Sequence, residues 1–300
     1  MSIHTGYIIG ADGGGTKTAM VLAGRDGREI GRLTAGPSNP TDLGESQSAE
    51  FLTETALELC GKCGVAPSEI AAIFFGIAGG SNELFRTLCK KSLKAAFPQS
   101  RTGVLHDAVN IVYASFPDSD GVAIICGTGC SCFVKKGEKL HRIGGYSIFD
   151  ITGNGYEIGK RAISHALACY DGRSERDLLS ALVEERVGED LIKALPRLLS
   201  ANKNEIARYA PLVFDAEEKG CREAHEIIVE NIARIAEYIN ASKRYFNASF
   251  CVSIAGGIFK SPRSMELLLP MVRVDCRISV LDREPVLGAV KKAETLLTNE

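Results

Sequence analysis

Residues 7–24 read YIIGADGGGTKTAMVLAG, and this stretch decides the fold. Its apolar run 7–11 is typical of a buried strand, the glycine-rich segment 12–18 of a turn, and the run 19–23 of a second strand. A polar turn and the alternating residues 29–33 then indicate a third strand. We therefore expect a hairpin that turns on glycines and continues into a third strand.

The glycine turn fits neither of the two best-known phosphate loops. A P-loop requires Lys directly after its last glycine, but Thr16 follows Gly15 here. The dinucleotide fingerprint requires a third glycine at the position of Thr18. Both loops are excluded, and an ordinary glycine-rich hairpin remains as the alternative to an anion site.

Three successive residues without side chains, Gly13, Gly14 and Gly15, let backbone N–H groups approach an anion closely. The two threonine hydroxyls of the turn can donate to the same anion. Asp12, at the end of the first strand, can hold a divalent cation through water, as phosphate sites commonly require. The turn is thus a candidate site for phosphate and a metal ion.

A second copy of this pattern starts at residue 120. An apolar run 122–126, the turn Gly127-Thr128-Gly129, a second apolar run 130–134 and a third segment 139–143 follow one another. Two such modules predict a duplicated α/β fold, in which two glycine turns face one another across a cleft and bind a phosphate chain from both sides.

The remaining elements complete the two halves. In the first half we predict helices at 46–63, 83–97 and 108–115 and strands at 71–77 and 103–106, giving the order βββαβαβα. In the second half we predict helices at 159–169, 175–187, 189–199, 204–218 and 221–246, then strands at 250–254 and 278–281 and a closing helix at 286–298. The expected lobes are 1–117 and 118–300, with the closing helix packing back on the first lobe.

Composition bears on the classes of partner. The chain has 300 residues, with 35 Lys and Arg against 37 Asp and Glu, and neither sign is grouped into runs. We therefore expect no nucleic acid and no membrane partner. Residues 1–6 show no signal pattern, and no apolar run approaches the ~20 residues that cross a bilayer. We predict a cytoplasmic protein.

The ten cysteines are expected to be reduced. Cys60 and Cys63 form a CxxC, but a zinc site needs a second pair of ligands, and a helix end before Gly64 accounts for the motif. Three further cysteines, within 126–132, flank the second glycine turn and are interpreted as small buried residues.

Taken in order, these motifs resemble the sugar kinase, heat-shock ATPase and actin superfamily, and within it the BadF/BadG/BcrA/BcrD ATPase family that contains N-acetylglucosamine kinase. The phosphate-1 motif is similar to residues 12–18, the phosphate-2 motif to residues 127–129 and the adenosine motif to residues 255–257. The resemblance implies actin-like (ribonuclease H-like) domains that bind ATP with Mg²⁺ in an interdomain cleft.

The same resemblance implies site residues. The residues implied for ATP are Gly13, Gly14, Gly15, Thr16, Lys17, Thr18, Gly127, Thr128, Gly129, Gly256 and Gly257, with Asp12 for Mg²⁺. Asp107 is implied as the catalytic base, although a helix N-cap is the alternative for this residue. The residues implied for the sugar are Asn39, Asp107, Thr128, Gly145, Tyr146 and Asp150. A plain loop asparagine is the alternative for Asn39.

One departure concerns the sugar. N-acetylglucosamine kinases follow a GGW turn with a GDEGSGYWIG-like segment, whereas this chain has GGY at 144–146 and DITGNGYEIG at 150–159. The GYxIG end is kept but the acidic pair is out of register. Asp150 would replace the missing aspartate if the loop after Gly145 is one residue shorter here than in N-acetylglucosamine kinases.

The implied activity is transfer of the ATP γ-phosphoryl group to an amino sugar. N-acetylglucosamine or a related N-acetylhexosamine, including N-acetylmuramic acid, would be phosphorylated at the 6-position. The alternatives are a glucosamine or glucose kinase, an ATPase that activates a radical dehydratase through an iron–sulfur cluster, and a sugar sensor without turnover. Family members are often dimeric, so a homodimer is expected.

Overall fold

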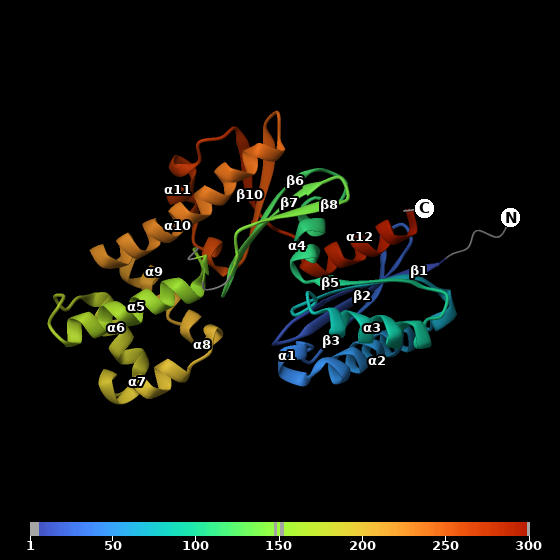
Figure 1. Cartoon of the computed structure of the whole chain (residues 1–300), viewed down its shortest axis with the longest axis horizontal. Helices are drawn as coiled ribbons and strands as arrows, with labels where there is room; N and C mark the ends of the chain where they lie inside the picture. Colours follow the sequence, from blue (N-terminus) through green and yellow to red (C-terminus); the bar gives the residue numbers. More distant parts are fainter. Residues whose placement is uncertain (1–5, 147–148, 151–152, 299–300) are drawn as a thin grey trace. The chain divides into compact units, whose positions relative to one another are not determined.

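The computed structural model describes residues 6–146, 149–150 and 153–298, and these residues form two units. The first unit runs to Ser119 and resumes at Leu281, whereas the second runs from Asp120 to Val280. Each unit contains one five-stranded sheet (Figure 1). Among the described residues, no helix has the length and apolar character needed to span a membrane.

The sheet of the first unit has the order β3-β2-β1-β4-β5. Its strands are β1 (Tyr7–Gly13), β2 (Thr18–Gly24), β3 (Glu29–Ala35), β4 (Ile70–Ile77) and β5 (Arg101–His106). The first three pair antiparallel, while β4 and β5 run parallel to β1. Gly13 pairs with Thr18, so the glycine-rich segment is the hairpin turn that the sequence predicted.

Helices cover both faces of this sheet (Figure 1). They are α1 (Pro40–Leu43), α2 (Glu45–Cys63), α3 (Glu83–Ala96), α4 (Ala108–Ser115) and α12 (Pro285–Thr298). The α2 and α3 helices share one hydrophobic core with the sheet, and α12 packs against β1 and α4. A Cβ at Gly10 would lie 2.3 Å from the Val290 nitrogen, and one at Gly288 would lie 1.8 Å from the Asn110 carbonyl oxygen. The closing helix can approach this closely because both positions lack a side chain.

The sheet of the second unit repeats the topology, with the order β10-β9-β6-β7-β8. Its strands are β6 (Gly121–Cys126), β7 (Cys130–Lys136), β8 (Lys139–Ile143), β9 (Phe250–Ala255) and β10 (Cys276–Val280). The first three are again antiparallel, and β9 and β10 again run parallel to the first. The duplication inferred from the two glycine turns is confirmed.

Most helices of the second unit lie between β8 and β9 (Figure 1). They are α5 (Gly155–Tyr170), α6 (Leu178–Val187), α7 (Leu191–Ser200), α8 (Lys203–Ala207), α9 (Ala210–Glu218) and α10 (Arg222–Ser242), and α11 (Pro262–Leu268) follows β9. One hydrophobic core joins them to β6, β7 and β9. The predicted buried face of α10 is confirmed, because Ala224, Ile228, Ile232, Ile235 and Ile239 are all buried.

Several predicted boundaries were wrong. The single helix expected at 204–218 is two helices, α8 and α9, because Pro211 has no N–H to donate to the preceding turn. The helix expected from 159 begins at Gly155, where Asn154 caps it, and the helix expected from 175 begins after the Asp177 cap. The short helix α1 was missed, whereas a helix after Gly257 was expected without bounds and is α11.

Candidate functional site

In the first unit, the predicted site residues gather at one edge of the sheet. Asp12 pairs with Gly76 across β1 and β4, and Ile77 pairs with His106 across β4 and β5. Because these three strands are parallel, their carboxyl ends meet at the same edge, which is where ligands bind in open α/β sheets. Asp12 and Asp107 therefore lie at the ends of strands on either side of β4, close enough to interact electrostatically.

The Asp12 carboxyl is partly buried and resists ionisation. Burial raises its pKa to about 6, and the charge of Asp107 adds to the rise, whereas the Asn110 hydrogen bond and the charge of Lys17 lower it. A bound cation would stabilise the charged form of such a group. The oxygen donor and its place beside an anion-binding turn suit Mg²⁺, which usually retains several waters.

Asn110 is a site residue that the sequence analysis missed. It is fully buried on α4, and its Nδ2 donates to Asp12 Oδ1 at 2.6 Å, Gly76 O at 2.9 Å and Ala11 O at 3.3 Å. A Cβ at Gly76 would lie 1.9 Å from Asn110 Oδ1, so the glycine makes room for the amide. The one available signal was a polar residue within the apolar helix 108–115.

The glycine turn has a fixed base and an open tip. At the base, Gly13 is buried, and a Cβ there would lie 2.3 Å from Ser38 Oγ. The fully buried Thr18 hydroxyl lies 2.9 Å from Gly36 O and 2.8 Å from Ser38 Oγ. These contacts fix the base of the turn to residues 36–38. Gly15, Thr16 and Lys17 at the tip are exposed, and their N–H groups and side chains are available to an anion.

The loop that carries Asn39 is tied to this turn. The Ser38 N–H donates to Gly14 O at 3.0 Å, which brings the two segments together. Asn39 itself caps α1, since its Oδ1 accepts from the Thr41 N–H at 3.1 Å and its Nδ2 donates to Asp42 Oδ2 at 2.9 Å. The side chain is held in one place but is only half-buried.

Asp107 stands at the N-cap position of α4 without acting as a cap. Its side chain makes no capping hydrogen bond, and its backbone is helical. Instead its Oδ1 lies 2.6 Å from His106 Nδ1, and the carboxyl is partly exposed. The carboxylate is therefore accessible to a substrate hydroxyl, which is the first requirement for a general base.

In the second unit, the Gly127-Thr128-Gly129 turn contacts the start of α5. The Gly155 N–H donates to Gly127 O at 2.8 Å, and the Tyr156 N–H donates to Thr128 O at 3.0 Å. The Thr128 hydroxyl donates to Asn204 Oδ1 at 2.8 Å. These contacts hold the turn rigidly beside a helix N-terminus, where the partial positive charge favours anions.

The end of β9 turns on Gly256. Its φ is +118°, and a Cβ would lie 2.1 Å from the Cys126 carbonyl oxygen. Only glycine fits such a conformation and such a close approach. At the following residue, Gly257, a Cβ would meet no atom within 4 Å, and this position opens onto a cavity.

That cavity has a volume of about 640 Å³, within the range of small-molecule sites. Three predicted ATP residues line it, namely Gly127, Thr128 and Gly257, whereas Gly129 and Gly256 do not. Its other lining residues, which the sequence analysis missed, are Gly155, Asn204, Ala207, Arg208, Ala210, Pro211, Phe214, Asp215, Ile258, Lys260 and Ser261. The mixture of apolar and polar groups around a glycine turn suits a purine base with its ribose and phosphates.

Three of the residues predicted to contact a sugar in this unit, Gly145, Tyr146 and Asp150, come together, whereas Thr128 contacts Asn204 in the cavity. Gly145 packs against the start of β7, where a Cβ would lie 2.7 Å from Cys130 O. Asp150 Oδ2 accepts from the Gly145 N–H at 2.5 Å and from the Tyr238 hydroxyl at 2.8 Å. Asp150 thus holds the turn, and Tyr146 beside it is 57% exposed.

Three buried thiols flank the phosphate-2 turn. Cys126, Cys130 and Cys132 are at most 8% exposed, as predicted. Burial raises the pKa of the Cys132 thiol to about 12. These cysteines contribute to the core of the second unit.

The duplicated sheets, the aspartates at a strand edge and the glycine-lined cavity define the actin-like class of nucleotide-binding proteins. The chain belongs to the BadF/BadG/BcrA/BcrD ATPase family, whose family model matches residues 9–290.

Relatives with assigned activities match over most of their length. The chain is 28% identical to an N-acetylmuramic acid/N-acetylglucosamine kinase of Clostridium acetobutylicum over 85% of this chain and 86% of that protein. It is 26% identical to an N-acetyl-D-glucosamine kinase of Dictyostelium discoideum over 78% of each chain. Among solved structures, a candidate N-acetylglucosamine kinase from Chromobacterium violaceum superposes with a TM-score of 0.80 at 22% identity, over 98% of this chain and 99% of that one. The last similarity supports the fold.

Proposed function

We propose that the protein is an ATP-dependent amino sugar kinase that phosphorylates the 6-hydroxyl of an N-acetylhexosamine. This sugar is N-acetylglucosamine or N-acetylmuramic acid. The single observation that carries this proposal is the arrangement at the edge of the first sheet. There an accessible Asp107 carboxylate lies near the Asp12 carboxyl and belongs to the same edge as the glycine turn. The kinases named among the relatives support the substrate class.

In this proposal Asp107 accepts the proton of the attacking sugar hydroxyl. In phosphoryl transfer the proton leaves late, so positioning and charge neutralisation supply most of the rate acceleration. A carboxylate that orients the hydroxyl is therefore sufficient as a base. Asn39, Gly145, Tyr146 and Asp150 would contribute to binding the sugar.

The glycine turns and the cavity would bind ATP. The N–H groups of residues 15–17 and those of Thr128 and Gly129 would contact the phosphates, while the Gly127 N–H donates to Gly129 O at 2.9 Å. The cavity beside Gly257 would hold the adenosine. Asp12 would hold Mg²⁺ through water, with Asn110 fixing the carboxylate. The ion would neutralise charge on the phosphates. A cytoplasmic location and a homodimer stay predictions.

The proposal is tested by an ADP-release assay with Mg²⁺-ATP and a panel of sugars. The panel contains N-acetylglucosamine, N-acetylmuramic acid, glucosamine, N-acetylmannosamine and glucose, and NMR identifies the phosphorylated carbon. We expect the highest kcat/KM with an N-acetylhexosamine and phosphate on the 6-oxygen. Equal rates with and without sugar would instead indicate an ATPase that acts on a partner protein.

A further inference from the structure

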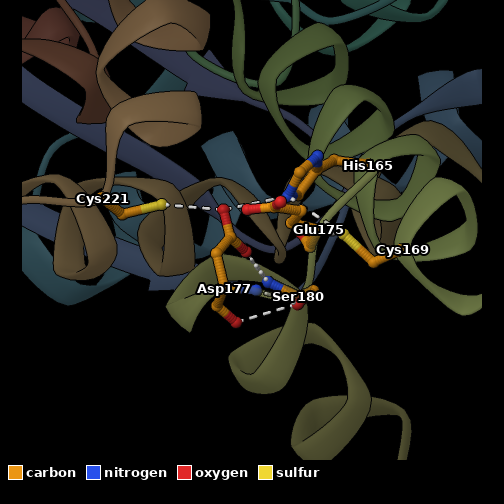
Figure 2. A network of polar contacts seen from close by, with 6 residues as sticks. All are labelled: His165, Cys169, Glu175, Asp177, Ser180 and Cys221. Carbon is orange, nitrogen blue, oxygen red and sulfur yellow. Dashed lines mark hydrogen bonds and ion pairs between the residues drawn. The ribbon is translucent and has the colours of Figure 1, made fainter. Parts of the chain in front are cut away.

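A cluster of nitrogen, sulfur and oxygen donors lies in the helical part of the second unit, and the proposed kinase chemistry does not use it. His165 and Cys169 are one turn apart on α5, and Asp177 caps α6. Cys221 stands at the N-cap position of α10. Figure 2 shows the four side chains converging from these three elements.

The distances in the cluster match those of a metal site. His165 Nε2 lies 3.0 Å from Asp177 Oδ2 and 3.4 Å from Cys169 Sγ, and the three donor atoms all lie within 4.8 Å of one another. Metal–ligand bonds of about 2.0 to 2.3 Å place the ligand atoms of a tetrahedral zinc site about 3.3 to 3.7 Å apart. Small side-chain shifts would therefore suffice to admit the ion.

The surroundings hold these donors in place. Asp177 Oδ1 accepts from the Ser180 N–H at 2.9 Å, which leaves Oδ2 directed at the histidine. The Cys221 thiol donates to the same Oδ2 at 3.2 Å (Figure 2). The side chain of His165 is 8% exposed and that of Asp177 is 28% exposed. The site is therefore mostly enclosed but open on one side for an ion to enter.

The donor set selects the kind of metal. Thiolate and imidazole are borderline and soft ligands that bind Zn²⁺ well, whereas Mg²⁺ prefers oxygen alone. The nearby cation Arg176 is paired with Glu184, so it does not occupy the carboxylate of Asp177. The cluster would therefore bind Zn²⁺ more tightly than Mg²⁺, the ion that the proposed kinase reaction requires.

We propose that His165 Nε2, Cys169 Sγ and Asp177 Oδ2 bind one Zn²⁺ ion, with water in the fourth position and the Cys221 thiol hydrogen-bonded to the Asp177 ligand. On binding, the Cys169 thiol releases its proton to solvent and the sulfur bonds to the metal as a thiolate. The ion fastens α5 to the start of α6, and Cys221 extends the contact to α10. None of these residues is among those proposed to bind ATP or sugar.

Metal content of the full chain, expressed with zinc and passed through a desalting column, tests this site. We expect about one zinc ion per chain in the wild type and less than about a tenth of that in His165→Gln and Cys169→Ser. Matched controls are His225→Gln and Cys251→Ser, which change the same residue types outside the cluster and should keep the zinc. Circular dichroism verifies that each variant is folded.

Cobalt substitution supplies a readout on the wild type that does not depend on variants. Co²⁺ bound to the cluster should give a thiolate-to-cobalt charge-transfer band and intense tetrahedral ligand-field bands. Cys169→Ser should lose the charge-transfer band, and Cys221→Ala should keep it with about tenfold weaker binding. A wild type without stoichiometric zinc and without the cobalt bands would overturn the proposal, as would zinc retained equally in His165→Gln and Cys169→Ser.

Discussion

At the scale of the residue, Asn110 and Asp12 form a closely held pair in the first unit. A buried amide donates to a partly buried carboxyl and to two backbone carbonyls, and Gly76 leaves the space for it. Such an arrangement fixes the carboxylate before any ligand binds, which lowers the entropic cost of binding a cation. Asn110 is thus a positioning residue that acts through Asp12.

The first prediction concerns Asn110→Ala. The loss of three buried hydrogen bonds should lower the free energy of unfolding by about 2 to 4 kcal/mol. Release of the Asp12 carboxylate should raise the Mg²⁺ concentration for half-maximal activity by about tenfold. Asn231→Ala is the matched control, because Asn231 is 4% exposed and donates to Ile227 O at 2.8 Å in the second unit. It should lose stability without altering the Mg²⁺ requirement; a similar Mg²⁺ shift in both variants would contradict the positioning role.

The second prediction follows from the raised pKa of Asp12. Because the pKa rises from 3.8 in the unfolded chain to about 6 in the folded one, the folded state binds more protons between these values. The contribution of Asp12 to stability is therefore greatest below pH 4 and falls by about 3 kcal/mol as the pH rises through 6.

Urea unfolding at pH values from 4 to 7, without metal, measures this contribution. The free energy of unfolding of the wild type should fall relative to that of Asp12→Asn, which has no titrating group at this position. Saturating Mg²⁺ should reduce the difference, because a cation stabilises the charged carboxylate. Parallel pH profiles of the two proteins would show that Asp12 ionises as an ordinary exposed aspartate.

At the scale of the element, the two glycine-containing strand ends perform different tasks. The turn after β1 exposes its tip, whereas the turn after β9 packs its glycine against the Cys126 carbonyl. The second turn therefore cannot accept any side chain at residue 256. Its conformation sets the direction of the chain beside the cavity.

The third prediction compares two neighbouring glycines. Gly256→Ala should destabilise the protein by about 2 to 5 kcal/mol, because it adds a strained positive φ to a close contact with a backbone oxygen. Gly257→Ala is the matched control, since nothing lies within 4 Å of a Cβ there. Thermal unfolding measures both variants. Equal melting temperatures would contradict the packing at residue 256.

The elements also show what could be predicted from the sequence. Strands with short apolar runs and glycine turns were predicted correctly because hydrophobic periodicity and turn residues are local features of the sequence. Gly64 was recognised as the end of a helix, and its φ is +67°. The break before α9 was missed because Pro211 at the start of a helix is compatible with helix, and only the register of hydrogen bonds shows the interruption.

For the candidate site too, residues that follow a local sequence pattern were predicted and those placed by tertiary packing were not. The glycine turns and both aspartates lie on strand ends that a sequence pattern can identify. Asn110, Asn204 and Phe214 were missed because each reaches its site through tertiary packing of helices distant in sequence. Such contacts leave no local pattern.

At the scale of the whole molecule, the C-terminal segment of the chain belongs to the first unit. Residues from Leu281 onward belong with the residues that precede Ser119, and α12 packs on β1 and α4. The second unit is a continuous segment with its own hydrophobic core. The two units therefore differ in their dependence on the rest of the chain.

The fourth prediction is that residues 120–280 fold when expressed alone, whereas residues 1–119 do not. Without α12, Gly10 loses its close contact with Val290 and Asn110 its contact with Gly288, so β1 is exposed on one face. Joining residues 1–119 to residues 281–300 through a flexible linker should restore folding. Circular dichroism and protease resistance report the outcome, and a stably folded fragment 1–119 would contradict the role assigned to α12.

Sugar phosphorylation with Asp107 as the base can be tested by comparing wild-type and variant initial rates. Initial rates of ADP release are compared with and without N-acetylglucosamine or N-acetylmuramic acid, for the wild type, Asp107→Asn and the surface control Asp171→Asn. We predict sugar-dependent release in the wild type and the control, and a kcat reduced about 10² to 10⁴-fold in Asp107→Asn. Near-normal sugar phosphorylation by Asp107→Asn, or release that does not respond to sugar, would contradict the account.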